Sequence, residues 1–462
     1  MTGSTFHYRP EDDFLPVEAI HSLQERLLRE QLLYCKTHSP FYRDKLAGFD
    51  CERMGLDNLP ELPLTSKADL AEEGAERFMA APAKDFEDIV FSSGTTGNPC
   101  MIAYTKHDME RLAYNEHRCF AAAGMTAEDT VLLTCTLDRC FVAGLAYYLG
   151  VRSLGAAAIR SGLNTLESHA EIIRRVHPSC LIGVPSFLRH LGHHLKGRKV
   201  DASSVKRLIC IGEPVRDEQL NSSGLGRQLE ELWNAPVHST YASSEIVSSF
   251  CECTERRGGH LLPDLVLAEI VDDAGNVLPP GSAGELVLTQ LQCRGMPLIR
   301  FRTGDMTFID DTPCPCGRNS LRIGPILGRK AQMLKCRGTT LYPQTVFSVL
   351  DESPEILDYY LVATGENLSD RLEIVAAPKE EGLSMHAVSE RLRAKCRLSI
   401  PITLKPEEEV RARIFSVSRK PVRFFDLRKG KEKGEGKRED EMPSLSAIKK
   451  QEERTEKGRT QE

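Results

Sequence analysis

The stretch CLIGVPSFLRHLGHHLK, residues 180–196, gives a clear indication of the fold class. Its apolar beginning predicts a strand over 180–184, and the run that follows predicts a helix over 186–195. The same alternation recurs on both sides, with strands expected at 130–134 and 208–211 and helices at 166–176 and 216–233. Strands that alternate with helices predict an α/β layer with a largely parallel sheet between residues 88 and 245.

The flanking segments predict a helical N-terminus and a β-rich unit. Apolar residues at helical spacing predict an amphipathic helix over 18–34, and Thr65 or Ser66 is a candidate cap for another helix. The stretch LVLAEIVDDAGNVLPPGSAGELVLTQL, residues 265–291, predicts three strands with a turn at 274–276. The β-rich unit is therefore expected to belong to the same large domain as the α/β layer.

A smaller α+β unit is predicted from about residue 328 onward. Its expected elements are a helix at 344–350, strands at 357–363 and 371–376, and a helix at 384–396. The charged segment 429–462 has no aromatic residue and cannot offset its ordering entropy by burial, so it is expected to be disordered. The predicted domains are 1–327, then 328–428 joined through a hinge, then this tail.

Composition limits the class of protein. The 462 residues are 41% hydrophobic and carry a net charge of −6, which gives no general attraction to nucleic acid or to anionic membranes. No apolar run approaches the roughly 20 residues that span a bilayer, and the N-terminus lacks an apolar signal core. Fifteen cysteines, an odd number at irregular spacing, favour a reducing compartment. We expect a soluble, cytoplasmic protein that binds neither nucleic acid nor membrane.

A candidate anion site lies at FSSGTTGNP, residues 91–99. Glycine and hydroxyl residues after an apolar run form loops whose backbone N–H groups and side-chain hydroxyls can surround a phosphate. The spacing differs from that of the Walker loop, which ends in Gly-Lys-Ser or Gly-Lys-Thr. Taken alone, such a cluster can equally be a surface turn.

The loop resembles the S-S-G-T-T-G-K-P signature of adenylate-forming enzymes, the acyl-CoA synthetase superfamily, with Asn98 in place of the lysine. Ala242 likewise replaces a glycine of that family, and Ala331 with Gln332 replaces an acidic pair. The segments HSPFYRDKL and LPLTSKADL favour the branch of the phenylacetate–CoA ligases. Four further motifs follow in the order of the family, namely GEP at 212–214, YASSE at 241–245, RFRTGD at 300–305 and GRKAQMLKCRGTTLYP at 328–343.

The resemblance implies which residues bind ATP and AMP. Tyr241 would stack on adenine, while Asp305 and Arg329 would hold the ribose. Glu245 would hold Mg²⁺. The full set implied for the nucleotide is Ser92, Ser93, Gly94, Thr95, Thr96, Gly97, Gly212, Glu213, Pro214, Tyr241, Ala242, Ser243, Ser244, Glu245, Asp305 and Arg329.

The resemblance also implies a catalytic lysine. The segment SVSRKPVRFFDLR resembles the S-x-G-K-A-x-R-x-x-D ending of that branch and matches it at Lys420, Arg423 and Asp426. Attack of a carboxylate on the α-phosphorus brings two anions together, so the site must supply positive charge and hold the attack in line. Lys420 would bridge the two anions beside the Glu245 metal site, and the C-terminal domain would rotate between two half-reactions. Candidate substrate-pocket residues are Phe141, Gly144, Pro185 and Ile211.

The expected activity is therefore that of an ATP-dependent carboxylic acid–CoA ligase. An aryl or arylacetic acid such as phenylacetate would react through an acyl adenylate, with release of pyrophosphate and AMP. The expected partners are the acid, ATP and CoA, with a homodimer as a further expectation from the resemblance. Two alternatives remain, which are transfer of the adenylate to an acceptor other than CoA and a nucleotide-binding protein without turnover.

A zinc site is expected from two cysteine-containing stretches, FCECTERRGGH and CPCGR. Together they offer one more ligand than the four that a tetrahedral zinc ion needs. Some relatives in the phenylacetate branch look similar at Cys253, His260, Cys314 and Cys316, which we take as the ligands of a structural Zn²⁺ in the β-rich part at about 250–320. The alternative is that these cysteines, with Cys251, are small buried apolar residues.

Overall fold

A six-stranded sheet forms the centre of the N-terminal part, in the order β4-β3-β5-β6-β7-β8. The computed structural model describes residues 6–91, 100–138, 140–336, 339–366, 369–380, 382–416 and 422–428. The first five strands are parallel and β8 is antiparallel to β7, so the predicted α/β layer is confirmed. The strands are β3 (Thr130–Leu133), β4 (Ala157–Arg160), β5 (Cys180–Gly183), β6 (Arg207–Ile211), β7 (Val237–Ser243) and β8 (Ser248–Cys251).

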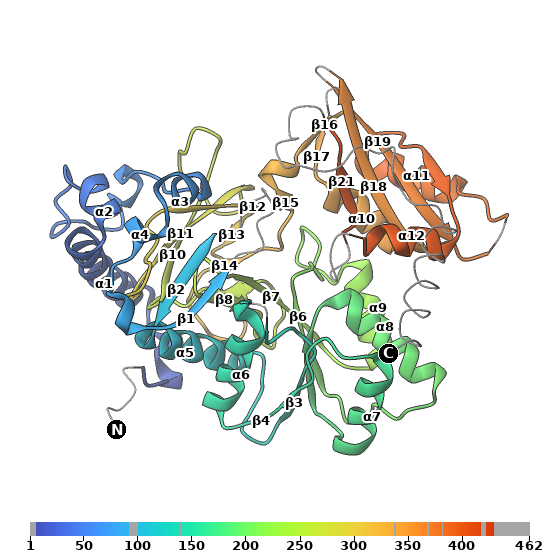
Figure 1. Cartoon of the computed structure of the whole chain (residues 1–462), viewed down its shortest axis with the longest axis horizontal. Helices are drawn as coiled ribbons and strands as arrows, with labels where there is room; N and C mark the ends of the chain where they lie inside the picture. The colour runs from blue at the N-terminus through green and yellow to red at the C-terminus, as the bar shows by residue number, and fades with distance from the viewer. Residues whose placement is uncertain are drawn as a thin grey trace, which may run out of the picture.

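Helices surround this sheet (Figure 1). They are α5 (Lys106–Ala122), α6 (Val142–Leu154), α7 (Leu166–Val176), α8 (Pro185–Gly197) and α9 (Gly224–Trp233). The prediction of a helix over 216–233 was wrong in its first part, since α9 begins only after the cap residue Ser223. The Arg216 guanidinium is instead held by Glu252 at 3.0 Å, and the Arg216 backbone forms a β-bridge with Ser222.

The β-rich unit consists of a four-stranded and a three-stranded sheet. The first contains β10 (Val266–Val271), β11 (Gly284–Gln290), β12 (Phe301–Thr307) and β15 (Gly328–Arg329), and the second β9 (Gly259–His260), β13 (Ile309–Asp310) and β14 (Arg322–Ile323). The predicted turn is confirmed, with Gly275 at a φ of 94°. The strand expected after it is reduced to one bridge between Val271 and Val277, because the chain turns away through two prolines.

A long helix, three short helices and a hairpin precede these layers. The helices are α1 (Val17–His38), α2 (Pro40–Lys45), α3 (Lys67–Glu73) and α4 (Ala75–Phe78), and the hairpin pairs β1 (Phe86–Phe91) with β2 (Met101–Thr105). The predicted amphipathic helix is confirmed, with Ile20, Leu27 and Gln31 buried. Ser66, one of the two candidate caps, forms a capping box with Asp69 at the start of α3. The candidate anion loop joins β1 to β2, but residues 92–99 lie outside the described residues.

The C-terminal unit is an α+β layer, drawn in orange and red in Figure 1. Its sheet has the order β20-β19-β18-β21, and a separate hairpin joins β16 to β17. All four predicted elements are confirmed, whereas β20, β21, α12 and the hairpin were missed. The elements are β16 (Leu334–Cys336), β17 (Thr339–Leu341), α10 (Pro343–Asp351), β18 (Ile356–Glu366), β19 (Ser369–Pro378), α11 (His386–Cys396), β20 (Ile402–Leu404), α12 (Glu407–Ile414) and β21 (Phe424–Asp426).

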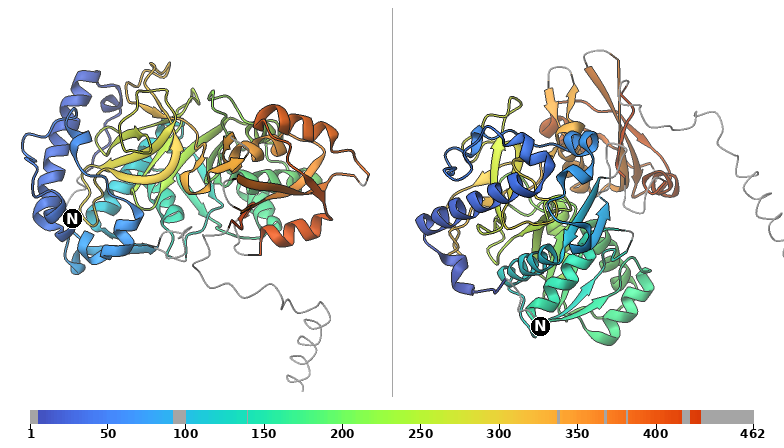
Figure 2. Two further views of the ribbon diagram at one scale, coloured as in Figure 1. Left: turned by 90° about the horizontal axis from the view of Figure 1, so that it is seen from above. Right: turned by 60° about the vertical axis from the view of Figure 1, so that its left-hand side comes forward.

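The two parts are linked near the predicted hinge. Strand β15, which begins at Gly328, still pairs with β12 of the N-terminal part, and β16 opens the C-terminal unit. The exact division at 327/328 stays a prediction, as does the tail 429–462, which lies outside the described residues. Figure 2 shows the C-terminal unit beside the green helices of the α/β layer. Within the described ranges, no helix has the length and apolarity needed to cross a membrane.

Candidate active site

The candidate site lies where the parallel strands end. Tyr241 and Ser243 lie at the C-terminal end of β7, Glu245 follows in the turn before β8, and Gly212 comes directly after β6. Ligands of open parallel sheets bind beyond the carboxyl ends of the strands. The Gly212 φ of 79° and the free space around its Cα suit a close approach by a ligand.

Three of the predicted nucleotide residues, from separate motifs, are in direct contact. The Tyr241 hydroxyl donates to Oδ2 of Asp305 at 2.8 Å, and Nε of Arg329 lies 3.3 Å from Oδ1 of the same carboxylate. Burial raises the pKa of Asp305, while the Arg329 guanidinium opposes that shift. The register of β12 and β15 explains the second contact, since Asp305 and Arg329 are paired residues across the ladder. The residues expected to hold adenine and ribose are thus brought together.

Glu245, the predicted magnesium ligand, is a buried carboxylate. Its side chain is only 6% exposed, and Oε1 lies 3.0 Å from Nζ of Lys67. Burial by itself would raise the pKa of Glu245, but Lys67 and a hydrogen bond from Ser243 outweigh it and lower the pKa. The neighbouring backbone is fixed as well, because Gln290 donates to the Glu245 carbonyl at 3.1 Å. Glu245 therefore offers an ionised carboxylate in a fixed position, the kind of oxygen donor that can bind Mg²⁺.

Lys67 was missed by the sequence reasoning, although LPLTSKADL was recognised as a segment. The Thr65 backbone explains its position, because the N–H of Thr65 donates to Arg300 and its carbonyl accepts from Arg302. The cap residue Ser66 then starts α3, and Lys67 is the first residue of that helix. The only sequence feature that points to Lys67 is its position directly after a helix-cap residue. A lysine at such a position is too common to predict a binding role.

Other predicted site residues lie at the same sheet edge with different contacts. The carboxylate of Glu213 accepts from the Ser186 backbone N–H at 2.8 Å and from its hydroxyl at 2.9 Å, so Glu213 caps α8. Gly144, in the first turn of α6, packs so closely against the Thr136 backbone that an added Cβ would lie 2.0 Å from the Thr136 carbonyl oxygen. The remaining candidates are Phe141 before α6, Pro185 at the first turn of α8, and Ile211 at the end of β6.

The catalytic lysine predicted from the resemblance, Lys420, lies outside the described residues, and so do Ser92 to Gly97. The chain is anchored directly after residue 421. The Val422 N–H donates to Ile414 at 2.9 Å, and Arg423 accepts from Leu361 of β18 at 2.7 Å. The Arg423 side chain is buried and lies over the Tyr359 ring at 4.8 Å. Arg423 thus fixes the end of this segment onto the sheet of the C-terminal unit.

The C-terminal unit also contacts the α/β layer directly. Gln228 of α9 donates to the backbone carbonyl of Asp351 at 2.8 Å, and Arg227 pairs with Glu352 at 3.1 Å. Gly224 allows this approach, because a Cβ there would lie 2.2 Å from Cγ of Glu352. The helices α9 and α10 therefore lie side by side with little space between them.

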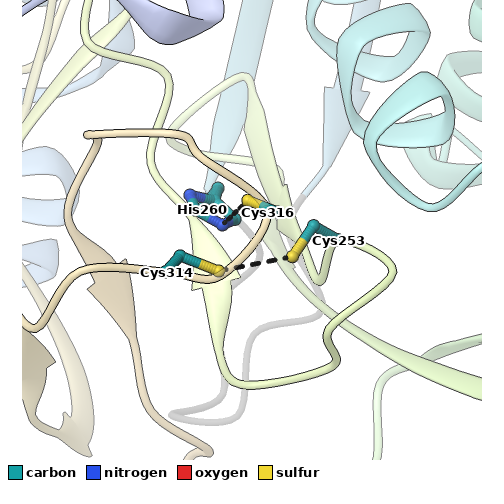
Figure 3. A group of neighbouring side chains, drawn as sticks. All are labelled: Cys253, His260, Cys314 and Cys316. Carbon is teal, nitrogen blue, oxygen red and sulfur yellow. Dashed lines mark hydrogen bonds between the residues drawn. The ribbon is translucent and has the colours of Figure 1, made fainter.

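The four predicted zinc ligands gather in one cluster (Figure 3). Their ligand atoms all lie within 4.8 Å of one another. Sγ of Cys253 is 3.7 Å from Sγ of Cys314, and Sγ of Cys316 is 3.5 Å from Nε2 of His260. Ligand sulfurs at about 2.3 Å from a tetrahedral zinc ion are roughly 3.8 Å apart, so the spacing fits zinc. Cys251 is outside the cluster and accepts from Thr240 instead.

The electrostatics of this cluster favour a cation. His260 makes a 2.9 Å hydrogen bond through Nδ1 with Ser320, which leaves Nε2 facing the sulfurs. Although burial opposes its ionisation, the hydrogen bond with His260 lowers the pKa of the Cys316 thiol to about 5. Burial raises the pKa of Cys253 and Cys314. Thiolates are the form that binds metal, so one ligand is already poised for it.

Comparisons with known proteins identify the family of this chain. A family model described as AMP-binding enzyme matches residues 51–293. A phenylacetate-coenzyme A ligase of Thermus thermophilus is 33% identical over 86% of this chain and 94% of that protein. A phenylacetate-coenzyme A ligase of Escherichia coli is 27% identical over 80% of this chain and 85% of that protein.

The fold is shared with a solved ligase. A 2-hydroxyisobutyryl-CoA ligase in its postadenylation state has a TM-score of 0.81 at 22% identity, covering 90% of this chain and 91% of that one. The predicted two-domain architecture of adenylate-forming enzymes is thereby confirmed as the fold class. The family model spans β7, which carries Tyr241, and the turn that carries Glu245, and the Thermus relative matches 86% of the chain. This chain belongs to the family of AMP-binding enzymes.

Proposed function

We propose that this protein is an ATP-dependent carboxylic acid–CoA ligase that works through an acyl adenylate. The observation that carries the proposal is the meeting of Tyr241, Asp305 and Arg329 at the carboxyl edge of the sheet, beside ionised Glu245. The similarity to phenylacetate-coenzyme A ligases over most of both chains supports the same reaction class. An arylacetic acid such as phenylacetate is the proposed substrate, because it is the acid in those relatives' names.

The described residues supply binding and orientation. Asp305 would accept hydrogen bonds from the ribose hydroxyls, with Tyr241 and Arg329 holding its carboxylate in place. Glu245 would hold Mg²⁺, which offsets the triphosphate charge when it is bound. Orientation of this kind converts the encounter of acid and ATP into a reaction within one complex. We propose Lys420 as the cation that bridges the acid and the α-phosphate.

We also propose a structural Zn²⁺ at Cys253, His260, Cys314 and Cys316. Four protein ligands close the coordination shell, so no position is left for a substrate, and the ion would stabilise the β-rich unit. A cytoplasmic location is supported by the cysteines, since none of the fifteen is in a disulfide. A homodimer is proposed only from the resemblance to the phenylacetate branch.

The test is pyrophosphate release from ATP and Mg²⁺ over a panel of carboxylic acids, with and without CoA. We expect release that depends on an arylacetic acid, followed by AMP formation that depends on CoA. Lys420→Ala should abolish release, whereas Lys405→Ala, an exposed lysine of the same unit, should retain it. AMP formation that does not depend on CoA would favour another acceptor. Saturable ATP binding without release for any acid would favour a binding protein.

A further inference from the structure

We propose that Lys67 binds the phosphate chain of ATP, and that it becomes free to do so when the Glu245 carboxylate takes up Mg²⁺. The ammonium group of Lys67 lies 3.0 Å from the Glu245 carboxylate. The proposal rests on the proposed function in one respect, namely that ATP is the nucleotide bound at this site. It assigns a role to a residue of the segment LPLTSKADL for which the resemblance implied none.

The surrounding contacts keep Lys67 at the site while leaving its side chain room to move. Thr65 forms a parallel β-bridge with Phe301 of β12, the strand that carries Asp305. The capping box of Ser66 fixes the next residue, so the Lys67 backbone has little freedom. Its side chain is 38% exposed, whereas that of Glu245 is 6% exposed. A lysine on a flexible four-carbon stem can therefore turn from the carboxylate to a phosphate without moving the backbone.

The charges around the site favour this movement of the Lys67 side chain. Residues 92–99, which connect β1 to β2 in the sequence, include neither lysine nor arginine. Among the residues that the structure describes, the Glu245 and Asp305 carboxylates are balanced by Lys67 and Arg329. ATP brings several negative charges, and a divalent cation on Glu245 would replace the single charge of the ammonium there. Lys67 would then face the triphosphate as a cation that is no longer bound to a carboxylate.

A simpler role would be a purely structural one, in which the pair of Lys67 and Glu245 holds α3 against the bend after β7. The two roles differ in their dependence on phosphate. A structural role would affect every ligand of the nucleotide site equally. A phosphate contact would affect ATP and leave adenosine unchanged, because adenosine lacks the group that the ammonium binds.

The experiment compares Lys67→Met and Lys67→Arg with the wild type by calorimetric titration. Lys67→Met keeps most of the side-chain volume and removes the charge. The matched control is Lys45→Met. Lys45 also forms an ion pair, at 3.6 Å with Asp69, and Asp69 lies on α3 as Lys67 does. Each protein is titrated with ATP and Mg²⁺, and separately with adenosine, in the absence of any acid or CoA.

We expect Lys67→Met to weaken ATP binding by about tenfold or more, the effect of losing one charge-assisted hydrogen bond. Its affinity for adenosine should stay within about twofold of the wild type, and Lys67→Arg should retain most of the ATP affinity, because a guanidinium also binds phosphate. Equal losses for ATP and adenosine, or no loss for ATP, would overturn the proposal. Wild-type pyrophosphate release tests the proposed function separately, so either proposal can fail while the other stands.

Discussion

The Tyr241 hydroxyl donates a 2.8 Å hydrogen bond to the Asp305 carboxylate, joining two motifs that are 64 residues apart. Arg329 reaches the other oxygen of the same carboxylate from β15, next to the hinge. A carboxylate that is only 14% exposed and held on both sides has its acceptor oxygens in fixed directions. This arrangement suits recognition of a pair of neighbouring hydroxyls, such as those of a ribose.

Asp305→Asn should therefore weaken the binding of ATP and of adenosine by a similar factor, about tenfold, because both ligands carry the ribose. Calorimetric titration of the two ligands measures this directly. Asp50→Asn is the control, since Asp50 is 61% exposed. A loss that was confined to ATP would contradict the assignment of Asp305 to the ribose.

The sequence alone predicted the α/β layer because its signal is local. The strand over 180–184 and the helices at 166–176 and 186–195 follow from the spacing of apolar residues, and they are confirmed to within two residues. The helix over 216–233 failed in its first part because Arg216 is held by Glu252, a partner 36 residues away. Such a tertiary contact leaves no trace in the local pattern.

The same distinction applies to the site. Tyr241, Glu245 and Asp305 became candidates because each belongs to a motif. The four residues of the cysteine–histidine cluster became candidates because their two stretches resemble those of relatives and offer the ligands that zinc prefers. Lys67 was missed because its role depends on Thr65 being paired with β12, which brings together segments more than 200 residues apart. The sequence could not show this pairing, since it is set by the packing of the whole β-rich unit.

Removal of the proposed zinc ion should destabilise the protein. Purified protein should contain about one zinc per chain by elemental analysis, and Cys314→Ser should reduce that content to near zero and lower the melting temperature, because ligand binding is part of the folding free energy. Cys251→Ala is the matched control, since Cys251 is a buried neighbour outside the cluster. Full zinc content in Cys314→Ser would show that the metal lies elsewhere, and none in the wild type would remove the site altogether.

Gly224→Ala should push the C-terminal unit away from α9. The added Cβ would lie 2.2 Å from Cγ of Glu352, far inside contact distance, although alanine is otherwise the better helix former. Small-angle X-ray scattering should show a larger radius of gyration, and adding Glu352→Ala should restore the wild-type value because it removes the clashing atom. Gly197→Ala is the control, since nothing lies within 4 Å of its Cβ position. An unchanged radius of gyration for Gly224→Ala would mean that the Glu352 side chain moves aside while the two units keep their positions.

Glu116 should make stability depend on pH. This carboxyl group on α5 is 1% exposed, and its Oε2 has no hydrogen-bond partner in the part of the chain that the structure describes. Burial raises its pKa from 4.5 to about 8, with a smaller opposing effect from Ser249. Between these values the folded chain keeps a proton that the unfolded chain has lost. The free energy of unfolding therefore falls as pH rises, by about 1.4 kcal/mol per pH unit, and levels off above about pH 8.

Glu116→Gln removes this titration and keeps the shape of the side chain. Urea unfolding at pH 6, 7 and 8, followed by the fluorescence of Trp233, the sole tryptophan, gives the free energy for both proteins. The wild type should lose stability relative to the variant across this range, while other titrating groups cancel in the difference. A difference that stays constant from pH 6 to 8 would mean that Glu116 is ionised in the folded protein, because only a retained proton produces the slope.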